Sequence, residues 1–401
     1  MLEEKLIEKL EEISKCLIEK NDLSGSQGAL AGEPGIALFL FYYSKFSQND
    51  TFSDKGLEIL EKSVEIINSG YNLTSFCSGI SGTAWVFDHL ESKNLLDIDN
   101  DEFLSDLEVY LFEDMIKDIK FGNYDFLHNS LGIAYYFLIR YYNTKSIALK
   151  NRYIGYLEKF IDELHLVSEL DENSIRWKTK FDHKDGEIVY NLNLAHGISS
   201  IIIFLTKLSE IEKFSLHVND ILYKAVNFIL KYYRDIDDSI SFFPSIIKEN
   251  EKLNFNTRLA WCNGDLGIGL SLWKASIVLK DIKLEELSIK ILKHASKRRD
   301  KNNTMVNDAG LCHGSFGNAQ IFMYLFKQTR ILDFQESTKF WLEDGLKQLH
   351  HDNTYAGHMK LTINGWKDEL SLLEGLAGIG LSIMAYLNPE FSLWDECLMI
   401  N

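Results

Sequence analysis

The clearest regularity along the chain is a short turn of small residues followed by a strongly apolar stretch. The pattern occurs seven times, for example as GEPGIALFLFYYS from Gly32 and GLAGIGLSIMAYL from Gly375. The seven copies start at Gly32, Gly79, Asn129, Gly197, Gly264, Gly314 and Gly375. By subtraction of these positions, successive starts are 47 to 68 residues apart, which is room for two helices and their connections. An internal repeat of this length predicts the architecture of the whole chain.

The segments between the apolar stretches have a different pattern. Charged and apolar residues alternate with helical spacing in GLEILEKSVEIINSG (56–70) and TKFWLEDGLKQLHH (338–351). A helix that is apolar all round is buried on most sides, whereas an amphipathic helix is half solvated. We therefore predict an all-α fold, an α/α toroid in which seven inner apolar helices and seven outer amphipathic helices close into a double ring.

Three stretches depart from the helical pattern. SIRWKTKF (174–181) and EIVYNLNL (187–194) alternate apolar and polar residues around HKDG, which predicts a β-hairpin. Two further stretches of the same kind are TRLAW (257–261) and YAGHMKLTINGW (355–366). We expect these β-like excursions on one rim of the toroid, where loops can cover a central site.

The composition favours one domain. The chain has 401 residues, of which 46% are hydrophobic, and only three prolines, and no stretch is rich enough in Ser, Gly or Pro to be a linker. We predict a single domain over residues 1–401, with possible small rim insertions near 171–194 and 351–366.

The net charge and the N-terminal sequence argue against nucleic-acid binding, membrane insertion and secretion. The formal net charge of −17 excludes nucleic acid as the expected partner and disfavours an anionic membrane surface. Leu6, Leu10, Ile13 and Leu17 are spaced as in an amphipathic helix rather than a signal peptide. No apolar run is long enough to span a bilayer, so we expect a cytoplasmic protein without direct membrane insertion.

Candidate chemistry appears in two of the repeated turns. The chain has five cysteines, an odd number that does not suggest a disulfide framework. Cys262 precedes the fifth turn in WCNGDLG, and Cys312 and His313 precede the sixth in LCHGSFG. Two thiolates and one imidazole suit a catalytic Zn²⁺, which takes three protein ligands and keeps one position open. The alternatives are small buried cysteines without a metal, or a closed structural zinc site.

The order of the motifs A-H-G, W-C-x-G and C-H-G among seven glycine-led repeats resembles the lanthionine synthetase C-like family, over essentially the whole chain. The resemblance implies an α/α toroid with a catalytic zinc, and an activity that forms thioether rings in lanthipeptides. It places the zinc ligands on Cys262, Cys312 and His313.

The same resemblance implies three further site residues. The histidine of L-A-H-G falls on His196, the aspartate of Y-D-F-L on Asp125, and the arginine four residues before the first cysteine on Arg258. In the implied reaction a substrate thiolate adds to a dehydroamino acid, and the enolate that forms is stabilised and then protonated. Without the resemblance, each residue also has a structural interpretation, as a hydrogen-bonding histidine or a surface ion pair.

The chain departs from the family pattern at several positions. Asn263 stands where the family often has Tyr, Leu266 replaces the usual Pro, and Ser200 ends the fourth turn in place of Gly. The change at Asn263 is the most consequential, because a phenol that could hold or protonate the enolate is missing. His128 and Glu374 also lie at repeated turns, without an assigned role.

The leading hypothesis is a zinc-dependent lanthipeptide cyclase that acts on a dehydrated precursor peptide, after a separate dehydratase. One alternative is the addition of glutathione or another free thiol to dehydroamino acids in proteins. A second is a non-catalytic, zinc-containing toroid that binds peptides. A glycosidase would need two facing carboxylates, for which Asp125 and Glu374 are the only suggestion.

Overall fold

The structure of the chain is a computed structural model that describes residues 1–19, 25–180, 187–236, 240–249 and 251–401. The packing of its backbone divides it into two units. Unit 1 comprises Met1–Asp114, Gly132–Tyr156 and Asn307–Asn401, and unit 2 comprises Met115–Leu131 and Leu157–Val306. The prediction of one domain over residues 1–401 stays a prediction.

Each of the seven repeated turns leads directly into a helix, which begins at the residue after the predicted start of the copy. We call these the inner helices. They are α2 (Glu33–Ser47), α4 (Ile80–Ser92), α7 (Ser130–Asn143), α9 (Ile198–Leu208), α11 (Asp265–Leu279), α14 (Ser315–Thr329) and α16 (Leu376–Leu387). In α9 every residue except Lys207 is buried. Burial on all sides is what an apolar helix without a polar face predicts.

The amphipathic segments form the outer helices. They are α1 (Leu2–Glu19), α3 (Thr51–Asn68), α6 (Ser105–Lys120), α8 (Ile147–Leu166), α10 (Ser215–Leu230), α12 (Ile282–Lys297) and α15 (Leu332–Gln348). In α1 the four predicted aliphatic positions Leu6, Leu10, Ile13 and Leu17 are buried. Each contributes about 1.5–3 kcal/mol by leaving water. Shorter helical segments are α5 (Asn100–Phe103), α13 (Lys301–Thr304), η1 (Tyr355–Gly357) and η2 (Pro389–Leu398).

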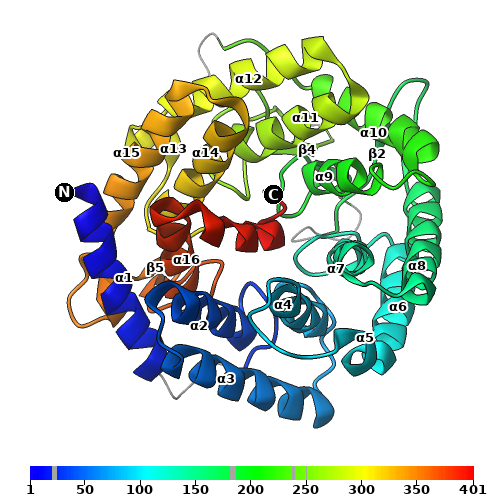
Figure 1. Cartoon of the computed structure of the whole chain (residues 1–401). Helices are drawn as coiled ribbons and strands as arrows, with labels where there is room; N and C mark the ends of the chain where they lie inside the picture. The colour runs from blue at the N-terminus through cyan, green and yellow to red at the C-terminus, as the bar shows by residue number, and fades with distance from the viewer. Residues whose placement is uncertain (20–24, 181–186, 237–239, 250) are drawn as a thin grey trace. The chain divides into compact units, whose positions relative to one another are not determined.

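Unit 1 is built around a series of neighbouring inner helices. α14 contacts α16, α16 contacts α2, and α2 contacts α4. Outer helices cover this series: α3 packs along α2, and α15 packs along α14, as Figure 1 shows. Consecutive helices of the chain thus form inner–outer pairs, and the pairs are placed side by side.

Unit 2 repeats the arrangement on a smaller scale. The inner helices α9 and α11 contact each other, α10 packs on α9, and α12 packs along α11 (Figure 1). The predicted all-α class with apolar inner and amphipathic outer helices is confirmed. Within the described residues, no helix combines the length and the apolar character needed to cross a bilayer.

The short strands pair differently from the predicted hairpin. They are β1 (Glu169–Leu170), β2 (Ile175–Arg176), β3 (Val189–Asn191), β4 (Ile246–Lys248), β5 (Lys360–Thr362) and β6 (Gly365–Lys367). The pairs are β1 with β2, β3 with β4, and β5 with β6, all antiparallel.

The hairpin predicted from 174–181 and 187–194 is therefore wrong in its pairing, since β2 and β3 each have a different partner. Its turn, HKDG, lies outside the described residues. The two stretches are nevertheless linked by the Thr179 N–H, which donates to the carbonyl of Val189 at 2.9 Å. Alternation identifies residues in extended conformation but not the strand that pairs with them. TRLAW forms no strand, whereas YAGHMKLTINGW contains β5 and most of β6.

A buried charge network in unit 1 links α4, α6 and α7. The Arg140 guanidinium is almost fully buried and contacts Asp88 at 2.7 Å and Glu108 at 3.0 Å, and it also reaches Asp101 at 2.9 Å. The Tyr153 hydroxyl donates to Glu108 at 2.7 Å. Burial raises the pKa of Asp88, and the Arg140 charge opposes this rise.

We expect Arg140→Met to lower the free energy of unfolding by about 3–5 kcal/mol, because it leaves two buried carboxylates without their cation. Denaturant-induced unfolding followed by circular dichroism measures the change. Arg152→Met is the matched control, since Arg152 is 31% exposed and lies 4.0 Å from Glu108. Equal stability of the two variants would show that the buried network does not stabilise unit 1.

Candidate active site and metal centre

Cys312 and His313 lie in the turn before α14, which backbone hydrogen bonds tie to the turn before α16. The N–H groups of Leu311 and Cys312 both donate to the carbonyl of Leu373, at 3.0 and 2.9 Å. Gly317, in the first turn of α14, has no room for a side chain, because a Cβ there would approach the carbonyl oxygen of Leu311 to 1.8 Å. The small residue that the repeat pattern requires is thus what lets the helix end approach its own turn.

Cys262 is positioned in the same way in unit 2. Its carbonyl accepts the Ala195 N–H at 3.5 Å, which links the turn before α11 to the turn before α9. The Gly264 N–H donates to the side chain of Asn193 at 2.9 Å. Gly264 has φ +77°, and a Cβ there would meet the Arg258 carbonyl oxygen at 2.3 Å. Only glycine fits this left-handed position, so the turn that presents Cys262 is strictly specified.

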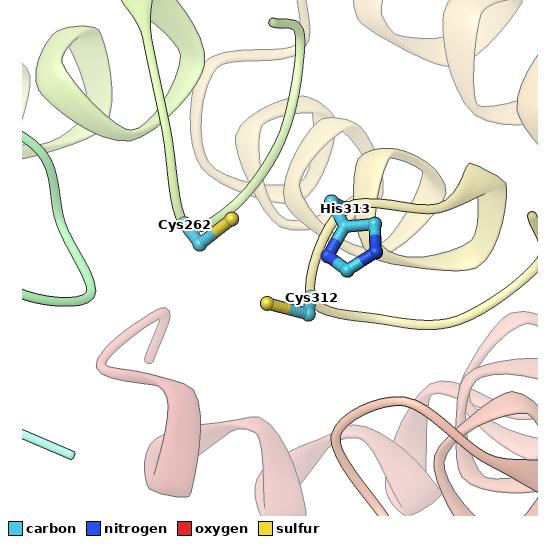
Figure 2. Close-up of side chains that lie close together, drawn as sticks. All are labelled: Cys262, Cys312 and His313. Carbon is cyan, nitrogen blue, oxygen red and sulfur yellow. The ribbon is translucent and has the colours of Figure 1, made fainter. Parts of the chain in front are cut away.

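The three residues predicted as ligands lie together. Cys262, Cys312 and His313 are all half-buried, and their ligand atoms lie within 4.8 Å of one another. Figure 2 shows the two sulfur atoms and the imidazole turned toward one another. In a tetrahedral zinc site with Zn–S bonds of about 2.3 Å, two sulfurs lie about 3.8 Å apart. The observed group fits such an ion with only small side-chain movements, and its two sulfurs and one nitrogen are donors that zinc accepts.

Asp308 stands behind His313 and was not identified from the sequence. Its Oδ2 lies 3.4 Å from His313 Nε2 and also accepts the Leu361 N–H at 3.3 Å, while Oδ1 accepts the Gly310 N–H at 3.1 Å. Burial, the largest single influence, raises the pKa of Asp308, but the hydrogen bond and charge of His313, the Leu361 N–H and the charge of His358 together keep the pKa below its ordinary value. Because Asp308 faces Nε2, Nδ1 is the ring nitrogen that could bind a metal.

A histidine–aspartate pair lies in unit 2, on the turn that is bonded to Cys262. His196 Nδ1 contacts Asp125 Oδ2 at 2.6 Å, and the Asp125 side chain is 6% exposed. Because the carboxylate accepts at Nδ1, the other ring nitrogen of His196 is the one that can exchange protons. The pair has the geometry of a general acid–base with an orienting carboxylate.

His128 joins this pair, although no role was predicted for it from the sequence. Its backbone N–H donates to Asp125 Oδ1 at 2.9 Å, so both carboxylate oxygens are engaged. Its ring lies 5.5 Å from that of His196, centroid to centroid, with an angle of 15° between the planes. Desolvation lowers the pKa of the His128 imidazole, Asp125 opposes this effect, and His196 adds to it.

Arg258 and Asn263 line a cavity of about 490 Å³ that includes Cys262. Arg258 is half-buried, and among the described residues it has no ion-pair partner. The Asn263 amide oxygen accepts the Ser245 hydroxyl at 2.9 Å, which leaves the amide N–H groups of Asn263 for other acceptors. The cavity thus presents one cation and one amide donor beside the first cysteine. Ser245 belongs to the segment before β4, and no sequence signal pointed to it.

Glu374, the second carboxylate considered for a glycosidase, has a structural contact. It pairs with Lys360 at 2.9 Å, and Lys360 also contacts Glu369 at 2.6 Å. This ion-pair network joins β5 to the turn before α16 and gives no support to the carboxylate as a catalytic acid.

Comparisons with known proteins agree with the geometry. The chain can be superimposed on a solved structure described as nisin cyclase with a TM-score of 0.72 and 19% sequence identity, covering 99% of this chain and 96% of that one. This likeness shows a shared fold. A structure described as a sugar epimerase from a ruminal bacterium has a TM-score of 0.48 and 11% sequence identity, covering 97% of this chain and 99% of that one. A family profile described as lanthionine synthetase C-like protein matches residues 25–399, and the chain therefore belongs to the lanthionine synthetase C-like family.

Proposed function

We propose that this protein is a zinc-dependent lanthipeptide cyclase, which adds cysteine thiols of a precursor peptide to dehydroalanine or dehydrobutyrine. The observation that carries the proposal is the convergence of Cys262, Cys312 and His313 to within 4.8 Å. Membership of the lanthionine synthetase C-like family and the fold of a structure described as nisin cyclase support it.

In the proposal, Cys262, Cys312 and His313 hold one Zn²⁺, with Asp308 orienting the imidazole. A bound zinc would lower the pKa of a coordinated substrate thiol, which is otherwise mostly protonated at neutral pH. Three protein donors would leave one position of a tetrahedral zinc ion for that thiol. All three ligand residues are half-buried, so none of them is sealed from solvent.

The substrate sulfur forms a bond to the β-carbon of the dehydroamino acid, and the electrons of the carbon–carbon double bond move onto the adjacent amide as an enolate. Arg258 places a positive charge beside Cys262 and stabilises this negative charge. The Asn263 amide lies in the same cavity and donates a hydrogen bond to the enolate oxygen in place of the phenol that the family often has there.

The enolate is then protonated at the α-carbon. His196 is the proposed proton donor, through the ring nitrogen that does not face Asp125. The buried Asp125 carboxylate fixes the orientation of the ring. After proton transfer His196 is neutral and is reprotonated by solvent, or by the proton that the substrate thiol released.

The proposed partner is a dehydrated precursor peptide supplied by a separate dehydratase, and the proposed compartment is the cytoplasm. The negative net charge of −17 suits a basic peptide segment better than an acidic one.

The deciding experiment is incubation of the zinc-loaded protein with a dehydrated, cysteine-containing peptide, with and without glutathione. Loss of the free thiol without a change in mass is the expected result, and it reports an intramolecular ring. A gain of one glutathione mass would assign the protein to intermolecular thiol addition instead. Thiol loss no faster than in the absence of protein would identify a non-catalytic toroid. Removal of zinc by a chelator, followed by its return, controls for loss of the folded protein.

A further inference from the structure

A second group of metal-ligand side chains lies in unit 2, outside the proposed zinc site. Asp125, His128 and His196 each offer one ligand atom, and these atoms lie within 4.8 Å of one another. The proposed acid–base chemistry uses Asp125 and His196 but has no task for His128. A third donor residue beside a working pair therefore needs its own explanation.

We propose that Asp125, His128 and His196 form a second binding site for a divalent transition metal. This site binds Zn²⁺ when zinc is present in excess over the first site. Two imidazoles and one carboxylate are a donor set that suits late first-row ions such as Zn²⁺. Three protein ligands leave the remaining positions to water. The single carboxylate leaves the occupied site with one net positive charge, which a protein of net charge −17 tolerates.

The contacts of the three residues permit this binding. Asp125 is buried and fixed by the His128 N–H at 2.9 Å, so it anchors the site from the protein side. His128 is exposed as a residue, its ring lies against that of His196, and its ligand atom is within 4.8 Å of the ligand atoms of Asp125 and His196. His196 Nδ1 and Asp125 Oδ2 share a proton at 2.6 Å. The ion replaces that proton, which leaves to solvent, and the two atoms then separate to about 3.3 Å, as in a tetrahedral site with bonds of about 2.0 Å.

Occupation of the second site has a functional consequence that rests on the proposed cyclase activity. An ion held by His196 and Asp125 removes both from proton transfer to the enolate. The protein is then active with one bound zinc and inhibited when a second one binds. His128 is the residue that makes the difference, because without it only a two-ligand site is left.

The test is a titration of the full-length protein, first loaded with one equivalent of zinc. A second equivalent of Zn²⁺ is added and followed by calorimetry, and the titration is repeated with Co²⁺ to record its absorption spectrum. We expect weaker binding of one further ion, with cobalt d–d bands but without thiolate-to-cobalt charge transfer. His128→Gln should weaken this binding at least about 100-fold, given that even outer-shell partners of metal ligands contribute 10–100-fold. His217→Gln, on the exposed surface of α10 in the same unit, is the matched control and should bind like the parent.

Cyclisation assays complete the test. The rate of the parent should fall as free zinc rises, whereas the rate of His128→Gln, expressed relative to its own rate with one bound zinc, should stay constant over the same range of zinc concentration. Binding of the second ion at equal strength in the parent and in His128→Gln overturns the inference, as does the absence of a second binding event at millimolar zinc. These outcomes are independent of the cyclase proposal, which fails only if the one-zinc protein forms no ring.

Discussion

Cys312→Ala is expected to abolish stoichiometric zinc binding and to reduce ring formation to the rate of the uncatalysed addition. Cys312 supplies one of the two sulfurs of the proposed site, and Cys262 and His313 alone form an incomplete donor set. Without the metal, a substrate thiol with an ordinary pKa of about 8.5 stays mostly protonated at neutral pH. Metal analysis of the purified variant and mass spectrometry of alkylated peptide products measure the two effects.

The matched control is Cys16→Ala. Cys16 is half-buried on α1, in the same unit as Cys312, so the variant removes one thiol without touching the site. Its zinc content and rate should equal those of the parent. The zinc proposal is wrong if Cys312→Ala retains one equivalent of zinc and the parent rate. If Cys312→Ala loses its zinc but keeps the parent rate, the zinc is not needed for ring formation and has a structural role.

The fold class was predictable because the helical pattern is strong and local. In α16, ten consecutive residues from Leu376 to Ala385 are buried, and in α1 the buried positions recur with helical spacing. The spacing of apolar residues is a property of a short segment. Each segment therefore predicts which of its own residues are buried. The repeated small residues at the turns mark where each inner helix begins, which is why the predicted starts and the observed helix bounds agree.

The convergence of the candidate metal ligands was predictable for a related reason. A repeat places equivalent positions of successive copies at equivalent places in the structure, so cysteines at matching levels of two turns are expected to meet. Cys262 and Cys312 satisfy this expectation. The roles of His196, Asp125 and Arg258 came from the family resemblance, and these roles stay proposals.

The residues that sequence reasoning missed are those whose partners lie far away along the chain. Asp308 faces His313 in the folded loop, yet nothing in NDAGLCHG distinguishes it from a surface aspartate. Ser245 contacts Asn263 only because the segment before β4 returns to the turn that holds Cys262. The pairing of β3 with β4 is a long-range choice of the same kind, since short alternating segments carry no information about register or partner.

Among the proposed acid–base residues, His196→Gln is expected to lower the turnover rate by about 100-fold to 10,000-fold while zinc content stays at one equivalent. The imidazole donates the proton to the α-carbon, and a glutamine amide cannot. Asp125→Asn should have an effect in the same range, because the 2.6 Å contact to His196 then lacks an anionic acceptor and the ring loses its tautomer and orientation. Rates measured with saturating peptide separate these losses from weaker substrate binding.

The double variant His196→Gln/Asp125→Asn tests whether the two residues act as one unit. Asp125 acts through His196, so the double variant should be no slower than His196→Gln alone, within about twofold. Multiplied losses would mean that Asp125 has a separate role, for example as a ligand or a contact to the peptide. His217→Gln, with its exposed imidazole on α10, should leave the rate unchanged. If His196→Gln turns over at the parent rate, another group donates the proton to the α-carbon. The cavity lined by Arg258, Cys262 and Asn263 is then the place to search for that donor.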